Sequence, residues 1–368
     1  MSNQINTKSE LNSNKLLGLE LVRFFSAFSV LIWHYPLFFF STDKSVNFVS
    51  ENLPFYSILS FFYNFGLQGV IVFWGISGFI FFWKYYDKIF ENNISAKNFF
   101  IFRFARLYPL HLATLIIVAL LQYLYFFKQN YYFVYQINDL KHFLLHIFLA
   151  SDWGFQNDYS FNGPIWSVSA EVFSYLIFFI ALKKFGKSFI VNIFIITTCV
   201  ALRILKLSNP VTDCMTIFFL CGSAALIFRS IELLPYKKFV HLGFLIIAII
   251  IPVAIVVLNL FEHEHFIYVF QFVYIPLILF LSAIEFNFLS KFRILVEILG
   301  NITYSSYLIH FPVQLLISLM CVFFDIKIDF YSSQFFIIYV TFIFLLSHLI
   351  FGFFEKPLQN LIRRKFCS

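Results

Sequence analysis

Three ionisable residues, Glu20, Arg23 and His34, lie in one apolar stretch near the start of the chain, LGLELVRFFSAFSVLIWHYP. Glu20 and Arg23 are three residues apart and can form an ion pair on one helix face. Eleven residues separate Arg23 from His34, which returns to within about 20° of the same direction about 16 Å further along a helix. Ionisable groups in such a stretch indicate a functional site, and an imidazole can act as a base or nucleophile. A structural ion pair with a core histidine remains the alternative.

Two more arginines, Arg103 and Arg106, stand three residues apart in NFFIFRFARLYPLH. Each guanidinium group can bind phosphate oxygens through two parallel hydrogen bonds, and the pair is therefore suited to hold a phosphorylated ligand at a membrane surface. We expect both in a connection that leads to a helix with Pro109 in its first turn. Ordinary basic anchors at the membrane surface are the competing interpretation.

Polar and small residues interrupt three later apolar stretches. Glycines allow helices to pack closely, which is the simplest interpretation of the glycines in GVIVFWGISGF. Glu171 is the only carboxylate in its stretch, and we expect it to face a cavity because a charged group facing lipid is costly. The residues of interest are Ser77 and Gly78 in GVIVFWGISGF, Asn162, Trp166, Ser167 and Glu171 in FNGPIWSVSAEVFSY, and Tyr304 and His310 in LGNITYSSYLIHFPV.

No metal site is expected. The segment FEHEHF, which includes Glu262 to His265, lacks the i, i+4 spacing with which two histidines of a helix bind zinc. The five cysteines are scattered in or beside apolar stretches without paired spacing, which is typical of small buried hydrophobic residues.

The composition indicates how these residues are positioned. The 368 residues are 61% hydrophobic and only 12% charged, against about 25% charged residues in a soluble protein, and lipid must therefore cover the surface. The net charge is +7. In a membrane protein such an excess indicates basic loops on the cytoplasmic side rather than binding to nucleic acid.

We predict an all-α bundle of about ten transmembrane helices in a single domain over residues 16–360. Residues 1–15 would be a polar cytoplasmic N-terminus and residues 361–368 a basic cytoplasmic tail. Nineteen lysines and arginines fall on the side of both termini and six on the other, which places both termini in the cytoplasm. The second and ninth spans are long and interrupted by glycine, and we expect each to be tilted or broken. The predicted spans are 17–40, 56–83, 108–127, 162–182, 188–205, 213–234, 239–260, 264–285, 296–324 and 334–354.

Taken in order, these motifs resemble the integral-membrane acyltransferase-3 family, whose members acylate O-antigen, capsule, exopolysaccharide and nodulation-factor sugars. The resemblance covers residues 16 to about 360. Trp74 and Thr303 depart from the family pattern, which usually has Phe and Ser there. The matching blocks are Arg23 with His34; Gly69, Val70, Phe73, Ser77, Gly78 and Phe79; Arg103, Arg106, Leu107, Tyr108 and Pro109; Trp166, Ser167, Val168 and Glu171; Leu299 to Pro312; and Glu355 with Pro357.

The resemblance implies transfer of an acyl group, typically acetyl from acetyl-CoA, to a hydroxyl of a glycan or lipid-linked saccharide at a bacterial cytoplasmic membrane. His34 would be the general base or would carry the acyl group covalently. Glu171 would orient the acceptor or relay a proton from the opposite side. Glycan-assembly proteins are possible partners. Arg23, Arg103, Arg106, Ser77 and Gly78 would bind the donor, and Asn162, Trp166, Ser167, Tyr304 and His310 the acceptor.

Two other functions fit buried charges in a helical bundle. A transporter or flippase for a polysaccharide intermediate would move the glycan without acylating it, although the sequence lacks the inverted repeat of many transporters. A non-catalytic subunit of a glycan-assembly complex would leave surface acetylation intact when His34 is replaced.

Overall fold

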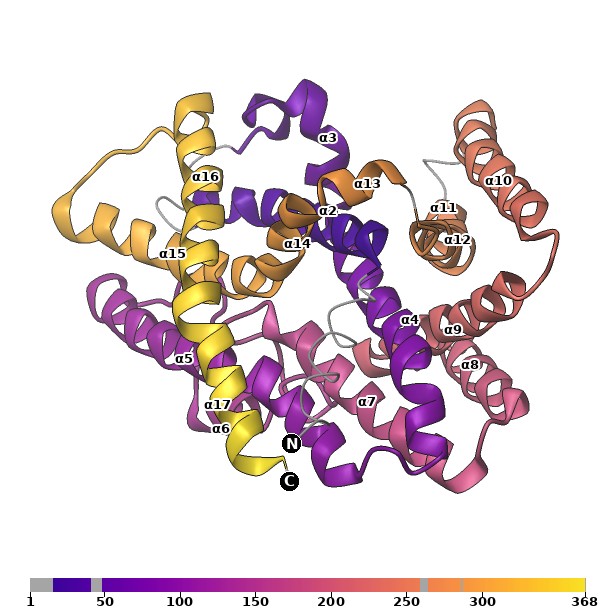
Figure 1. The fold of residues 1–368 in the computed structure, drawn as a ribbon. Coiled ribbons are helices and arrows are strands. Elements are labelled where there is room, and N and C mark those ends of the chain that lie inside the picture. The colour runs from indigo at the N-terminus through magenta and orange to yellow at the C-terminus, as the bar shows by residue number, and fades with distance from the viewer. Residues whose placement is uncertain (1–15, 41–47, 259–263, 286, 368) are drawn as a thin grey trace.

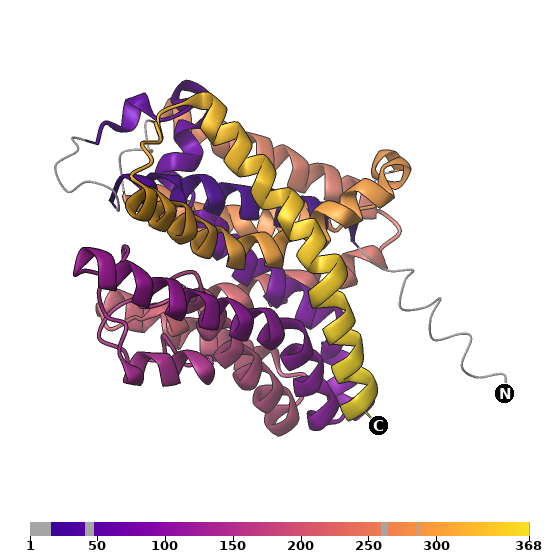
Figure 2. The ribbon, with the colours of Figure 1, turned by 90° about the vertical axis from the view of Figure 1, so that its left-hand side faces the viewer.

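The computed structural model describes residues 16–40, 48–258, 264–285 and 287–367, and the predicted N-terminal segment 1–15 lies outside them. Within the described residues the chain is built from helices and contains no β-strand. Figures 1 and 2 show these helices gathered into one bundle, with α16 and α17 joined end to end along one side. Eight helical segments are long and apolar enough to cross a membrane, which confirms the predicted all-α membrane bundle. The cytoplasmic location of both termini stays a prediction.

The eight long segments account for most of the chain. The short helices connect them or cover their ends. The long segments are α2 (Leu17–His34) with η1 (Tyr35–Phe40), α4 (Gln68–Phe90), α5 (Ala96–Gln129), α7 (Ile165–Phe185), α9 (Pro210–Glu232), α10 (Lys237–Val257), α15 (Thr303–Phe324), and α16 (Ser333–Ile350) continued by η5 (Phe351–Glu355) and α17 (Lys356–Phe366). The short ones are η2 (Ser50–Asn52), α3 (Tyr56–Phe65), α6 (Leu140–Ile147), α8 (Phe189–Ile204), α11 (Glu264–Val269), η4 (Phe270–Tyr274), α12 (Ile275–Ser282), α13 (Asn287–Lys291) and α14 (Arg293–Asn301).

Each predicted span coincides with a helical segment. The predicted spans 188–205 and 264–285 correspond to shorter apolar helices, Phe189–Ile204 and Phe266–Ser282. The breaks expected in the second and ninth spans are present, because α3 ends at Phe65 before α4 begins at Gln68, and α14 ends at Asn301 before α15 begins at Thr303. The predicted tail is helical as far as Phe366, since α17 continues through it.

The predicted connection before the third span is wrong. Helix α5 begins at Ala96, where the side chain of Ser95 accepts a hydrogen bond from the backbone N–H of Asn98, and it runs unbroken to Gln129. Pro109 therefore lies inside this helix rather than in its first turn. Hydropathy marks the part of a helix that contacts lipid. Helix α5 extends beyond that part at its N-terminal end, through polar and basic residues. Arg103 and Arg106 consequently lie on a helix, three residues apart.

Close packing of α4 against α9 depends on glycine. A Cβ atom added to Gly78 would lie 2.0 Å from the carbonyl oxygen of Phe218, which is on α9. Small residues allow this approach of two backbones, which is a main source of attraction between membrane helices. Gly78 thus packs against α9, which is the simpler of its two interpretations from the sequence.

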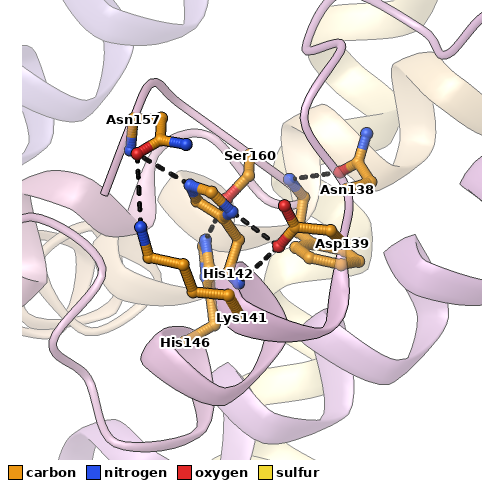
Figure 3. A network of polar contacts seen from close by, with 8 residues as sticks. Asn138, Asp139, Lys141, His142, His146, Asn157 and Ser160 are labelled. Carbon is orange, nitrogen blue, oxygen red and sulfur yellow. Dashed lines mark hydrogen bonds and ion pairs between the residues drawn. The ribbon is translucent and has the colours of Figure 1, made fainter. Parts of the chain in front are cut away.

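A segment of 35 residues between α5 and α7 is held together by polar contacts (Figure 3). The Nδ1–H group of His142 donates to Asp139 at 2.7 Å, while the backbone N–H of Asn157 donates to Nε2 of the same ring at 3.1 Å. Lys141 donates to the Asn157 side chain at 3.2 Å. His146 is bonded to the Ser160 hydroxyl at 3.1 Å. These bonds attach α6 to the residues that precede it and to those that follow it in the segment.

Asp152 lies in the same segment and is almost completely buried. Its Oδ1 atom accepts a hydrogen bond from the Gln156 side chain, while Oδ2 has no hydrogen-bond partner among the described residues. Burial raises the pKa of Asp152 to about 6. The folded protein therefore keeps a proton on this carboxyl group at pH values where the unfolded chain, with a pKa of about 3.9, has released it.

The substitution Gly78→Ala should destabilise the protein by about 1–3 kcal/mol, because the new methyl group must separate α4 from α9. Gly243→Ala is the matched control, since a Cβ atom at Gly243 meets nothing within 4 Å. Thermal unfolding in detergent measures both. Equal unfolding temperatures for the two variants would contradict the packing role of Gly78.

For Asp152, stability should decrease as the pH rises from about 4 to about 6, because the folded state binds more protons than the unfolded state in that interval. Asp152→Asn removes the titrating group. Its unfolding temperature should therefore change less over that pH range than that of the unmodified protein, and parallel curves would exclude a raised pKa.

Candidate functional site

A cavity of about 310 Å³ lies inside the bundle, a volume near the lower end for ligand pockets in proteins. Seven helices contribute to its walls: α2, α4, α5, α7, α14, α15 and α17. It brings together seven residues that the sequence singled out from five separate stretches. These are Arg23, Ser77, Arg103, Arg106, Ser167, Glu171 and Tyr304.

The cavity is strongly cationic. Among the described residues that line it, five carry positive charge and two are carboxylates. Lys84 is exposed and Arg363 is half-buried, whereas Ser167 and Tyr307 are buried, which identifies the cationic end as the outer end. The cationic residues are Arg23, Lys84, Arg103, Arg106 and Arg363, and the carboxylates are Glu20 and Glu171.

The Glu20–Arg23 ion pair predicted from the sequence is confirmed, with 3.0 Å between the guanidinium group and the carboxylate. Gly300 makes room for it, because a Cβ atom at Gly300 would lie 2.0 Å from the carboxylate oxygen of Glu20. The start of α2 thereby packs directly against α14. One arginine of the cavity is thus neutralised by a carboxylate of its own helix.

The two arginines of α5 have different surroundings. Arg103 donates a hydrogen bond to the Tyr85 hydroxyl at 2.6 Å, and its guanidinium carbon lies 5.0 Å from the Phe81 ring centre and 5.1 Å from that of Tyr85. These cation–π contacts fix the plane of the group. Arg106 lines the cavity without a hydrogen bond or ion pair to any described residue. Its charge remains available to a ligand.

Glu171 faces the cavity, as expected for a lone carboxylate in an apolar helix. Its Oε1 atom accepts hydrogen bonds from the hydroxyl groups of Ser77 on α4 and Tyr175 on α7. Glu171 also lies within electrostatic range of Arg106 and Arg23. The structure therefore places Glu171 among the cations of the cavity. Its role toward the acceptor stays a prediction.

At the inner end, three helices are joined by hydrogen bonds. The hydroxyl groups of Tyr307 and Ser167 are 2.6 Å apart, and Tyr307 also donates to the carbonyl oxygen of Pro164 at 2.9 Å. The Tyr304 hydroxyl donates to the carbonyl oxygen of Leu107 at 2.7 Å. Ser167 and Tyr304, both expected to contact an acceptor, are thus held by protein groups at the end of the cavity.

His34 and His310 form a pair beyond this end, and neither lines the cavity. Their ring centres are 4.8 Å apart, and the centre of the Tyr307 ring is 6.1 Å from that of His310. Tyr307 thus lines the cavity and also contacts the histidine pair through His310. Because α2 is continuous from Leu17 to His34, the stripe that joins Arg23 to His34 is present. The two residues are nevertheless in separate surroundings.

Both histidine rings are oriented in the same way. Nδ1 of His34 bonds to the carbonyl oxygen of Val30 at 3.0 Å, and Nδ1 of His310 to that of Ser306 at 3.2 Å. A carbonyl oxygen only accepts, and Nδ1 of each ring therefore carries the hydrogen. The lone pair of each ring is then on Nε2, and Nε2 of His310 is buried without a partner among the described residues. This arrangement suits proton abstraction or nucleophilic attack.

Three expected site residues have other surroundings. Asn162 is fully buried and donates to the Thr114 hydroxyl at 3.2 Å and to the Leu308 carbonyl oxygen at 3.1 Å. That carbonyl lacks its usual helical donor because Pro312 has no N–H group. Trp166 packs edge-on against Trp74, with ring centres 5.5 Å apart. Gly78 contacts α9 as described above and does not line the cavity.

Four polar or charged residues that line the cavity were not predicted from the sequence. Tyr175 could have been found, because it is four residues after Glu171 on the same helix face. Lys84 and Arg363 had been counted only as basic residues near the membrane, and Tyr85 had no distinguishing pattern. Their role depends on contacts between helices. The FEHEHF histidines lie outside the residues whose side chains the structure describes.

Comparison with known proteins supplies the identity. Residues 16–354, nearly the whole chain, match the family model for the acyltransferase domain of acyltransferase family 3. No curated protein and no solved structure gives a significant match. The family match agrees with the order of motifs in the sequence and with the helical bundle that carries them. The chain therefore belongs to acyltransferase family 3 and is a multi-pass membrane protein.

Proposed function

We propose that this acyltransferase moves an acetyl group from acetyl-CoA to a hydroxyl group of a cell-surface or lipid-linked glycan at a bacterial cytoplasmic membrane. The observation that carries the proposal is the cationic cavity, in which Arg106 has no ion pair with any described residue. Cations that outnumber carboxylates in a region of low dielectric constant favour a ligand with several negative charges. Coenzyme A carries such charges on its phosphate groups.

The shape of the cavity supports a direction for the donor. Phosphate groups would bind at the outer end, where guanidinium groups offer paired donors. The narrow pantetheine arm would extend between the aromatic residues toward Tyr307. Because Tyr307 lines the cavity and contacts His310, we expect the arm to displace this ring when the thioester reaches His34.

The histidine pair supports a general-base mechanism. Nε2 of His34 would take the proton of the acceptor hydroxyl while its oxygen attacks the thioester carbonyl carbon. The carbon–sulfur bond then breaks, and His34 returns the proton to the sulfur, which gives an O-acetyl ester and free coenzyme A thiol. His310 would accept a hydrogen bond from the acceptor through its unpartnered Nε2 atom. A covalent acetyl-histidine at the same Nε2 atom of His34 is the alternative.

His34→Gln should lower acetyl transfer at least about 100-fold, because no general base remains at this position. The assay uses purified protein, radiolabelled acetyl-CoA, and glycan from cells that lack the gene. His310→Gln should instead raise the KM for the acceptor. The exposed His348 on α16 gives the matched control, His348→Gln, which should leave transfer unchanged. Full activity of His34→Gln would exclude the mechanism. Label retained on the unmodified protein, but not on His34→Gln, would favour the covalent alternative.

Arg106→Gln should raise the KM for acetyl-CoA about tenfold or more, because a charge-assisted hydrogen bond to phosphate contributes about 1.5–3 kcal/mol. The KM for the glycan should not change. Initial rates over a range of both substrates separate the two constants. An increase confined to the glycan KM would assign Arg106 to the acceptor and contradict the donor site proposed above.

A further inference from the structure

Three guanidinium groups from two helices line the cationic part of the cavity, and that of Arg363 lies at its outer end. Arg103 and Arg106 belong to α5, whereas Arg363 belongs to α17, some 260 residues later in the chain. Arg103 and Arg106 both lie within electrostatic range of Arg363, and their guanidinium groups carry charge of the same sign. Like charges held together raise the energy of the protein unless an anion joins them.

Arg363 has no such anion within the described protein. Its guanidinium carbon lies 5.4 Å from the ring centre of Phe102, and its Nε atom is buried without a hydrogen-bond partner. No hydrogen bond or ion pair links Arg363 to a described carboxylate. The contact with Phe102 holds the side chain of Arg363 against α5, and its Nε atom remains without a hydrogen bond to any described residue.

The segment before α17 fixes the position of Arg363. Residues Phe351–Glu355 form a π-helical turn, which inserts an extra residue and changes the direction in which later side chains project. Glu355 within this turn is buried and accepts a hydrogen bond from Ser305 at 2.7 Å. The anchored turn leads into α17, which packs against α5, whereas Arg364 on the same helix is exposed.

We propose that Arg363 binds a phosphate group separate from the one that Arg106 binds, and that this group is the 3′-phosphate on the ribose of coenzyme A. The inference rests on the proposed function. Arg363 is at the outer end, whereas Arg106 is near Glu171 and Glu355 further in. A donor with a diphosphate and a separate phosphate monoester matches two such positions. A phosphate of an anionic lipid headgroup has the same chemistry and is the competing source.

Calorimetric titration of the purified full chain in phosphatidylcholine nanodiscs tests the inference with two probes, coenzyme A and 3′-dephospho-coenzyme A. The unmodified protein should bind coenzyme A about tenfold more tightly than the dephospho form. Arg363→Gln should bind both probes equally, at the affinity of the dephospho form. Arg363→Lys should retain part of the preference, because its charge is kept while the paired donors are lost.

Arg364→Gln is the matched control, because it removes the same charge from the exposed face of the same helix. It should keep the full preference. An Arg363→Gln variant that keeps the preference, or that weakens both probes equally, would overturn the inference. Loss of the preference when phosphatidylglycerol is added would assign the site to lipid. Acetyl transfer by the unmodified protein, measured on the same preparation, tests the proposed function separately.

Discussion

Positive charge enclosed by apolar helices is the constraint on which this structure depends. A buried guanidinium group is stable only with a counter-charge or hydrogen bonds. Glu20 supplies the counter-charge for Arg23, and aromatic rings with a tyrosine hydroxyl hold Arg103. Arg106 has only the longer-range attraction of Glu171 and Glu355. Among the described residues Arg106 thus has no direct counter-charge, and its guanidinium group is available to an anionic ligand.

The carboxylates that moderate this charge are held away from the arginines by hydroxyl groups. Ser77 and Tyr175 donate to Glu171, and Ser305 donates to Glu355. Each of these carboxylates thus has a hydroxyl donor, and neither forms a direct ion pair with Arg106. The same hydroxyl groups join α4 to α7 and α15 to η5, and α4, α7 and α15 line the cavity. Polar contacts here both shape the site and set its charge.

The positions of Glu20 and Glu171 depend in turn on close backbone approach. Gly300 admits the Glu20 side chain, and Gly78 brings α4 against α9. Ser77, next to Gly78 in the chain, then faces Glu171. Further along the bundle, Asn162 replaces the donor that Pro312 cannot offer to Leu308, two residues before His310. Residues without direct chemistry thus hold the chemically active side chains in place.

The sequence determined what happens within one helix, because the helical period fixes which residues share a face. It predicted the Glu20–Arg23 pair, the stripe from Arg23 to His34, the apolar helices and the family. It could not predict where α5 begins, because hydropathy reports lipid contact and not the end of a helix. Only the tertiary structure joined Ser77 to Glu171, brought Tyr307 against His310 at the wall of the cavity, and placed Arg363 in the same cavity as Arg103. These contacts depend on the directions in which helices pack, and residue spacing along the chain does not specify those directions.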